Sequence, residues 1–96
     1  MRLTFHPRAR NELWDAVDYY EEARSGLGEE FLDEFHSTCE RILETPRAWS
    51  KQTASTRRCL MKRFPYSVIY QLVDEQVRVI AVAHQKRRPG YWETRL

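Results

Sequence analysis

The periodicity of apolar residues changes once along this chain, near residue 56, and that change constrains the fold more than any other feature. Before it, apolar residues recur at the spacing of one face of an amphipathic helix. After it, β-branched and aromatic residues gather in short runs separated by turn residues, which is typical of strands. Because helices and strands occupy separate parts of the chain, we predict an α+β domain.

Two helices are predicted in the first part. The first is expected from about Pro7 to Arg24, because proline fits the first helical position, where its missing N–H costs nothing. Gly26 then fits a C-terminal cap. The second helix follows from Leu27 and ends at Pro46. The short glycine-containing turn between them predicts an antiparallel helical hairpin.

Four strands are expected, at residues 2–5, 57–62, 66–72 and 76–84. The last three are joined by short turns and should form an antiparallel meander, one face of which the hairpin covers. The other face is expected to be open or partly closed by a basic, aromatic C-terminal tail, residues 85–96. Residues 46–55 are expected to be an irregular loop. The predicted element order is β-α-α-β-β-β, in a single domain that spans residues 1–96.

Composition narrows the class of protein. A chain of 96 residues suits one domain with one modest core. Cys39 and Cys59 occur in no metal-binding spacing, which predicts neither a zinc site nor a disulfide framework and favours a reducing cytoplasm. The N-terminus lacks the apolar region of a signal peptide, and the longest wholly apolar run, residues 79–83, is too short to cross a membrane. We therefore expect a cytoplasmic protein without metal or cofactor.

Charge is distributed unevenly. Residues 1–55 hold seven Lys or Arg and eleven Asp or Glu, a net −4, whereas residues 56–96 hold nine and three, a net +6. The simplest interpretation is one domain with two oppositely charged surfaces. The functional interpretation is a basic face for an acidic partner, either a nucleic acid or an acidic protein segment.

Several short runs, in this order along nearly the whole chain, carry a family resemblance. They are Phe5-His6-Pro7-x-Ala9, Leu13, Tyr19-Tyr20, Gly26-Leu27-Gly28 with Phe31, Pro46 after Ile42, Arg57-Arg58, Arg63-Phe64-Pro65-Tyr66 with Tyr70, and His84-x-x-Arg87-Arg88-Pro89-x-Tyr91-Trp92. Together they resemble the RelE/ParE toxins of type II toxin–antitoxin (plasmid-stabilisation) modules. The segments RFPYSVIY and AVAHQKRRPGYW are the most specific part.

The resemblance implies a toxin that is neutralised by a cognate antitoxin in a hetero-oligomeric complex. The antitoxin's C-terminal segment is expected to wrap the toxin, and its other half to bind DNA. The superfamily divides by activity. RelE-like members cleave mRNA in the ribosomal A site, whereas ParE-like members block DNA gyrase without known nuclease chemistry.

Cleavage through a 2′-hydroxyl needs a base, a cation beside the phosphate and an acid for the leaving oxygen. Under this hypothesis His84 is the base or acid, because histidine suits both roles near neutral pH. Arg63 and Arg87 hold phosphate through their bidentate forks, and Tyr91 stacks on a base or donates a proton. None of these roles needs a metal.

Structural roles explain the same residues as well. His84 can be a hydrogen-bonded residue at a strand end, and Arg63 a surface charge. Arg57 and Arg58 alternate across a strand, so only one can face a given site, and one is expected to pair with helix carboxylates. Tyr91 and Trp92 can anchor the tail to the sheet. Further assignments are Lys86, Arg87 and Arg88 as a solvated face, Tyr19, Tyr20 and Tyr70 as core or rim aromatics, and Trp14 as an exposed contact for a partner.

The low net charge of +2 and the presence of only three lysines argue against a ribosome binder, whose affinity rests on neutralising phosphates. We therefore favour the ParE-like branch, with inhibition of DNA gyrase. The alternatives are a ribosome-dependent mRNA endonuclease and an inactive member that only binds antitoxin. The residues predicted to contact target or antitoxin are Trp14, Arg57, Arg58, Arg63, Lys86, Arg87, Arg88, Tyr91 and Trp92.

Overall fold

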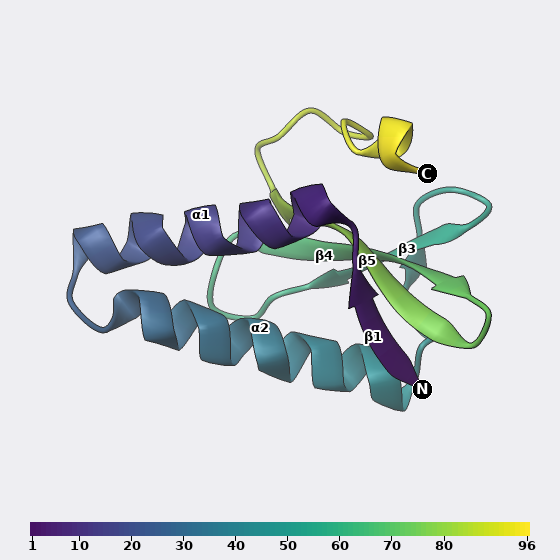
Figure 1. The fold of residues 1–96 in the computed structure, drawn as a ribbon, viewed down its shortest axis with the longest axis horizontal. Coiled ribbons are helices and arrows are strands. Elements are labelled where there is room, and N and C mark those ends of the chain that lie inside the picture. The colour runs from purple at the N-terminus through teal and green to yellow at the C-terminus, as the bar shows by residue number, and fades with distance from the viewer.

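A helical hairpin covers one face of a five-stranded sheet in the computed structural model, which describes residues 1–96 (Figure 1). The helices are α1 (Pro7–Ala23) and α2 (Leu27–Glu44). The other elements are β1 (Arg2–Phe5), β2 (Ser50–Lys51), β3 (Thr56–Leu60), β4 (Tyr66–Val73), β5 (Gln76–His84) and a short 3-10 helix, η1 (Glu93–Arg95). The predicted α+β architecture is confirmed.

The strands are ordered β1-β5-β4-β3-β2. The pairs formed by β3, β4 and β5 are antiparallel, as the meander prediction required, whereas β1 runs parallel to β5. Phe5 pairs with Val79, so β1 covers only the first half of the edge of β5. The prediction of an irregular loop over residues 46–55 was wrong at Ser50 and Lys51, which form β2 against β3.

The helical hairpin closes through a short connection at Gly26. Its φ of 88° is left-handed, which favours glycine, but Gly26 is the N-cap of α2, while Arg24 is the C-cap of α1. The Glu21 carboxylate accepts hydrogen bonds from the backbone N–H groups of Gly26 and Gly28 at 3.0–3.1 Å. A Cβ on Gly28 would lie 2.6 Å from the Val17 carbonyl oxygen, so glycine allows the two helices to approach closely here.

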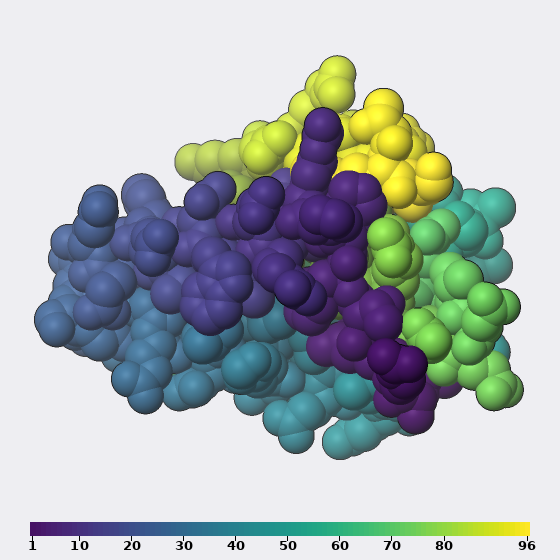
Figure 2. Space-filling model, viewed as in Figure 1, coloured from purple at the N-terminus to yellow at the C-terminus, as the bar shows by residue number.

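Apolar side chains fill both faces of the sheet. Between the helices and the sheet, Phe31, Phe35 and Ile42 pack with Val68 and Val79 in the main core. On the opposite face a smaller cluster forms. Its members are Ile69, Ile80, Ala81, Ala83 and Trp92. The C-terminal tail therefore partly closes the second face, and Figure 2 shows its last residues, in yellow, against the start of α1 and the sheet.

The two cysteines are free and buried in the main core. Burial raises the pKa of the Cys39 thiol to about 12. A thiol so held has little thiolate character, so Cys39 has a packing role rather than a nucleophilic one. Neither α1 nor α2 has the length and apolar composition that a membrane span requires.

Candidate functional site

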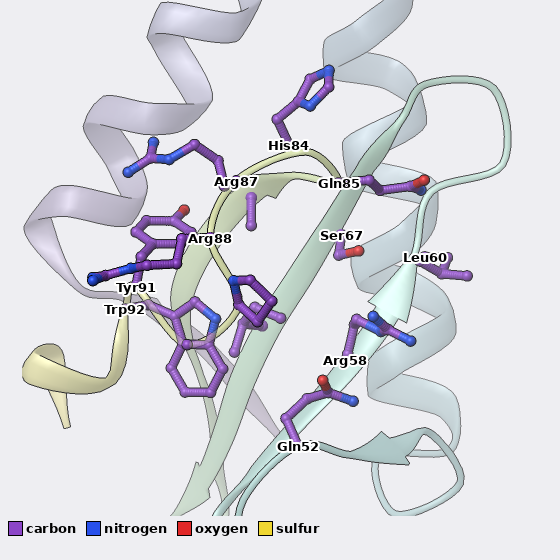
Figure 3. Close-up of a pocket in the computed structure, with 14 residues that line it drawn as sticks. Gln52, Arg58, Leu60, Ser67, His84, Gln85, Arg87, Arg88, Tyr91 and Trp92 are labelled. Carbon is purple, nitrogen blue, oxygen red and sulfur yellow. The ribbon is translucent and has the colours of Figure 1, made fainter.

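A groove of about 380 Å³ lies between the open face of the sheet and the C-terminal tail (Figure 3). We call it the tail groove. It is lined by Gln52, Arg58, Leu60, Ser67, Ile69, Ala83, His84, Gln85, Arg87, Arg88, Pro89, Gly90, Tyr91 and Trp92. The lining contains three arginines and no carboxylate, so three of the nine Lys or Arg residues of positions 56–96 share one surface.

The alternation of β3 decides which arginine reaches the tail groove. Arg58 is exposed and lines it, whereas Arg57 lies on the other face and donates to the Trp49 carbonyl oxygen at 2.8 Å. Only one of the two faces the site, as predicted. The expected ion pair between one of them and a helix carboxylate was wrong, because the four ion pairs of the structure involve neither residue. The Trp49 carbonyl takes the place of that carboxylate.

The tail is held by a buried polar cluster around Glu12 of α1. Its carboxylate accepts from the Tyr91 hydroxyl at 2.7 Å and from two guanidinium nitrogens of Arg95 at 2.8 and 2.9 Å. It also accepts from the Val82 backbone N–H at 3.0 Å, while Arg95 donates to the Ile80 carbonyl at 3.0 Å. These bonds satisfy the part of the β5 edge that lies beyond β1, and they fix the tail over the sheet.

Tyr91 and Arg87 form a stack at the end of the tail groove nearest α1. The Arg87 guanidinium lies 3.9 Å from the centroid of the Tyr91 ring. Burial and the hydrogen bond to Glu12 raise the pKa of the Tyr91 hydroxyl well above its usual range. Figure 3 shows the Arg87 side chain extending toward α1, away from Arg58.

His84 stands at the end of β5 with one ring nitrogen occupied. Its Nδ1 accepts a hydrogen bond from the Lys86 backbone N–H at 3.0 Å, which leaves Nε2 as the free nitrogen. The ring meets Tyr66 edge-on at 5.1 Å. Both contacts are those of a structural histidine: the residue borders the tail groove, but Figure 3 shows its ring pointing away from Arg58 and Trp92.

Two other predicted site residues, Arg63 and Lys86, lie outside the tail groove, whereas Arg88 lines it. Arg63 pairs with Glu30 of α2 at 2.7 Å and does not line the tail groove. This pair and the neighbouring Arg24 lower the pKa of the Glu30 carboxyl. Lys86 and Arg88 are exposed and form no ion pair.

Trp14 is 48% exposed on α1, in a separate apolar concavity of about 340 Å³ that also includes Phe5 and Phe35. The three tyrosines that were predicted to be core or rim aromatics differ in their burial. Tyr70 is fully buried, Tyr20 is half-buried against Phe31, and Tyr19 is 67% exposed.

Three groups of this region were not predicted from the sequence: Glu12, Ser67 and Arg95. Glu12 had only the signal of a carboxylate on the polar side of a helix, shared by several neighbours. Ser67 follows the conspicuous RFPY run, and its parity along β4 was the available sign that it faces the tail. The sequence indicated Arg95 only as one of several cations in the basic tail.

Comparison with known proteins identifies a family. A family model described as the ParE toxin of the type II toxin–antitoxin system parDE matches residues 3–89. Toxin ParE2 of Mycobacterium tuberculosis, from strains CDC 1551 and H37Rv, is 26% identical over 96 residues, which cover 99% of this chain and 91% of the relative.

Solved structures share the fold. A chromosomal ParDE system from P. aeruginosa matches with a TM-score of 0.65 and 14% identity, covering 88% of this chain and 95% of the other. Isolated E. coli RelE matches with 0.65 and 23%, covering 97% and 93%. A mutant of E. coli RelE in complex with an antitoxin RelBc peptide matches with 0.64 and 23%, covering 97% and 92%. Since the family model spans most of the sequence and the fold agrees, the chain belongs to the ParE toxin family of type II toxin–antitoxin systems, within the RelE/ParE superfamily.

Proposed function

We propose that this toxin inhibits growth by binding DNA gyrase in the cytoplasm, without catalysing RNA cleavage. The observation that carries the proposal is that two of the four candidate nuclease groups are already engaged by carboxylates within the protein. Arg63 pairs with Glu30 outside the tail groove, and the Tyr91 hydroxyl is committed to Glu12. For RNA cleavage, His84 and Arg87 alone would then have to supply the general base, the general acid and the contact to the phosphate.

The chemistry of the remaining pair supports inhibition over cleavage. A single imidazole with Nδ1 occupied can act as base or acid at Nε2, but in-line cleavage needs both functions on opposite sides of the phosphorus. Tyr91, with its raised pKa, is a weak proton donor for the second function. Arg87 is stacked on the Tyr91 ring, and Figure 3 shows its side chain and the His84 ring extending in different directions.

The partner that neutralises the toxin is, in this proposal, a cognate antitoxin encoded beside it in a plasmid-stabilisation type module. The family description and the antitoxin-bound RelE structure support this partner. The second candidate function, ribosome-dependent mRNA cleavage, is favoured by the arginines and His84 that line one groove. The third, an inactive member that only binds antitoxin, predicts no growth effect from the chain alone.

The test runs two purified assays in parallel, gyrase supercoiling and ribosome-dependent mRNA cleavage, with and without the antitoxin. We expect loss of supercoiling at micromolar toxin, intact mRNA, and recovery of supercoiling with antitoxin. His84→Ala should inhibit gyrase as the wild type does. Cleavage of mRNA that His84→Ala abolishes, with supercoiling untouched, would overturn the proposal in favour of the nuclease. Inactivity in both assays, together with normal growth on induction, would favour the inactive member.

A further inference from the structure

Two nearly buried side chains of the tail groove have polar atoms that no protein group satisfies. Ser67 is 4% exposed and Trp92 is 5% exposed, yet neither the Ser67 hydroxyl nor the Trp92 indole N–H has a hydrogen-bond partner in the protein. Among fully buried side-chain nitrogens and oxygens, only Arg95 Nε lacks a hydrogen-bond partner. The Ser67 hydroxyl and the Trp92 indole N–H are therefore accessible, and they open into the groove that their residues line. Donors that open into a groove and have no acceptor within the protein are free to bind an acceptor that comes from outside.

Arg58 adds a charged donor to the same surface. The register pairs Leu60 with Ser67 and Arg58 with Ile69, so Arg58 and Ser67 are diagonal neighbours on adjacent strands. Such neighbours lie ~7–8 Å apart, within reach of a long guanidinium side chain. Figure 3 shows Arg58 and the Trp92 indole beside the same concavity, with Ser67 on the strand between β3 and the tail.

The charge of the groove selects an anion. Its lining holds no Asp or Glu, and Arg58 forms no ion pair. A carboxylate has two oxygens and about four lone-pair sites, enough for a guanidinium, a hydroxyl and an indole N–H together. Hydrogen bonds to a charged acceptor are about twice as strong as neutral ones.

The shape of the groove favours a peptide over a nucleic acid. Arg87 is stacked on Tyr91 and directed toward α1, and Figure 3 shows the Arg88 side chain also extending away from Arg58, so Arg58 is the one guanidinium on the Ser67 side of the groove. Nucleic-acid affinity rests on several phosphates neutralised along a strand, and a single cation does not supply that. Beside the donors, Leu60 is 48% exposed and Pro89 is also exposed, which suits an apolar side chain next to the acidic one.

We propose that Arg58, Ser67 and Trp92 form a binding site for a carboxylate in an extended acidic and apolar segment of a protein partner. The carboxylate accepts from all three donors, and a neighbouring apolar side chain of the segment packs against Leu60 and Pro89. The inference rests on the proposed function, in that it takes the toxin to act and to be controlled through protein binding.

The experiment is a titration of the ¹⁵N-labelled toxin, followed by the indole N–H signals of its three tryptophans. The probe is the peptide acetyl-Leu-Glu-Leu-Glu-Leu-amide, and its twin carries glutamine in place of glutamate. We expect the glutamate peptide to shift the Trp92 indole signal, the glutamine twin to leave it in place, and the Trp14 and Trp49 signals to stay constant. Arg58→Gln should weaken binding about tenfold or more, and Ser67→Ala by a smaller factor.

Arg47→Gln is the matched control, because Arg47 is an exposed arginine outside the groove. It should bind the peptide as the wild type does, and the dispersed amide spectrum of each variant verifies its fold. The proposal fails if neither peptide moves the Trp92 signal, if both move it equally, or if hexauridylate moves it at lower concentration than the glutamate peptide. Gyrase inhibition is scored separately, so a toxin that binds the peptide but spares gyrase would contradict the proposed function and leave this site standing.

Discussion

Glu12 and Arg95, which lie 83 positions apart in the sequence, form a two-point ion pair at 2.8 and 2.9 Å. The Arg95 and Glu12 side chains are only 7% and 16% exposed. The pair completes the edge of β5 where β1 ends and holds the tail that forms one wall of the tail groove. The Glu12 carboxylate therefore fixes the position of the tail, and with it the shape of the tail groove.

Replacing Glu12 should be among the more damaging single changes outside the apolar core. Glu12→Gln leaves the nearly buried Arg95 charge without a counter-charge, which costs about 3–5 kcal/mol of the free energy of unfolding. Urea denaturation followed by far-ultraviolet circular dichroism measures this. Glu22→Gln, an exposed carboxylate of the same helix without an ion pair, should change stability by less than about 0.5 kcal/mol. Equal effects of the two variants would show that the ion pair contributes nothing.

The Trp92 ring should stabilise the fold as a core residue, although it lies in the tail. Trp92→Ala removes the largest member of the second apolar cluster and should cost about 3–5 kcal/mol. Amide exchange should show the loss first in residues 85–96. Trp14→Ala, at a half-exposed site on α1, is the control and should cost clearly less. A tail that stays protected in Trp92→Ala would contradict the anchoring role.

Tyr70 should make stability fall in strong alkali. Its hydroxyl donates to the Pro46 carbonyl at 2.6 Å, and burial raises its pKa to about 12 from an unfolded value near 10. A raised folded pKa means that the contribution is full below pH 10 and is lost as the pH rises toward 12. Tyr70→Phe should therefore cost about 1 kcal/mol at neutral pH and lose stability less steeply than the wild type above pH 10. Urea midpoints from pH 8 to 12 measure this, and the exposed Tyr19→Phe variant should follow the wild-type curve.

Gly28 should resist substitution although alanine favours helices. A Cβ would meet the Val17 carbonyl oxygen at 2.6 Å, so Gly28→Ala forces α1 and α2 apart and should cost about 1–3 kcal/mol. Thermal unfolding provides the measurement. Ser37→Ala, at an exposed position of α2, gains helix propensity without a clash and should not destabilise. A Gly28→Ala variant as stable as the wild type would mean that the hairpin adjusts without strain.

The sequence predicted the elements because their signals are local. Pro7 and Gly26 lie within one residue of helix boundaries. The short turn predicted between the last two strands is formed by Asp74 and Glu75, which both have positive φ. Burial of the helix stripe through Phe31, Phe35 and Ile42 follows from spacing alone. The family resemblance could also be recognised from the sequence, since it depends on short contiguous segments of the chain.

The site could be predicted less well from the sequence, because its residues come together only in the folded protein. Sequence parity could say that Arg57 and Arg58 face opposite ways, but only the packed helices decide which of them meets the core and which the tail groove. Likewise Arg63 lies in a predicted site run, yet the start of α2 brings Glu30 to it and removes it from the groove.

What the sequence determined by itself is an α+β chain with a helical hairpin, an antiparallel meander and a basic tail, together with membership of a toxin family. Only the tertiary structure decided that β1 lies parallel beside β5, that Glu12 holds the tail, and that Ser67, Trp92 and Arg58 share one groove. The physical reason is the distance along the chain over which each interaction acts. Periodicity and turn chemistry act over a few residues, whereas a buried ion pair between positions 12 and 95 forms only when the whole sheet brings its partners together.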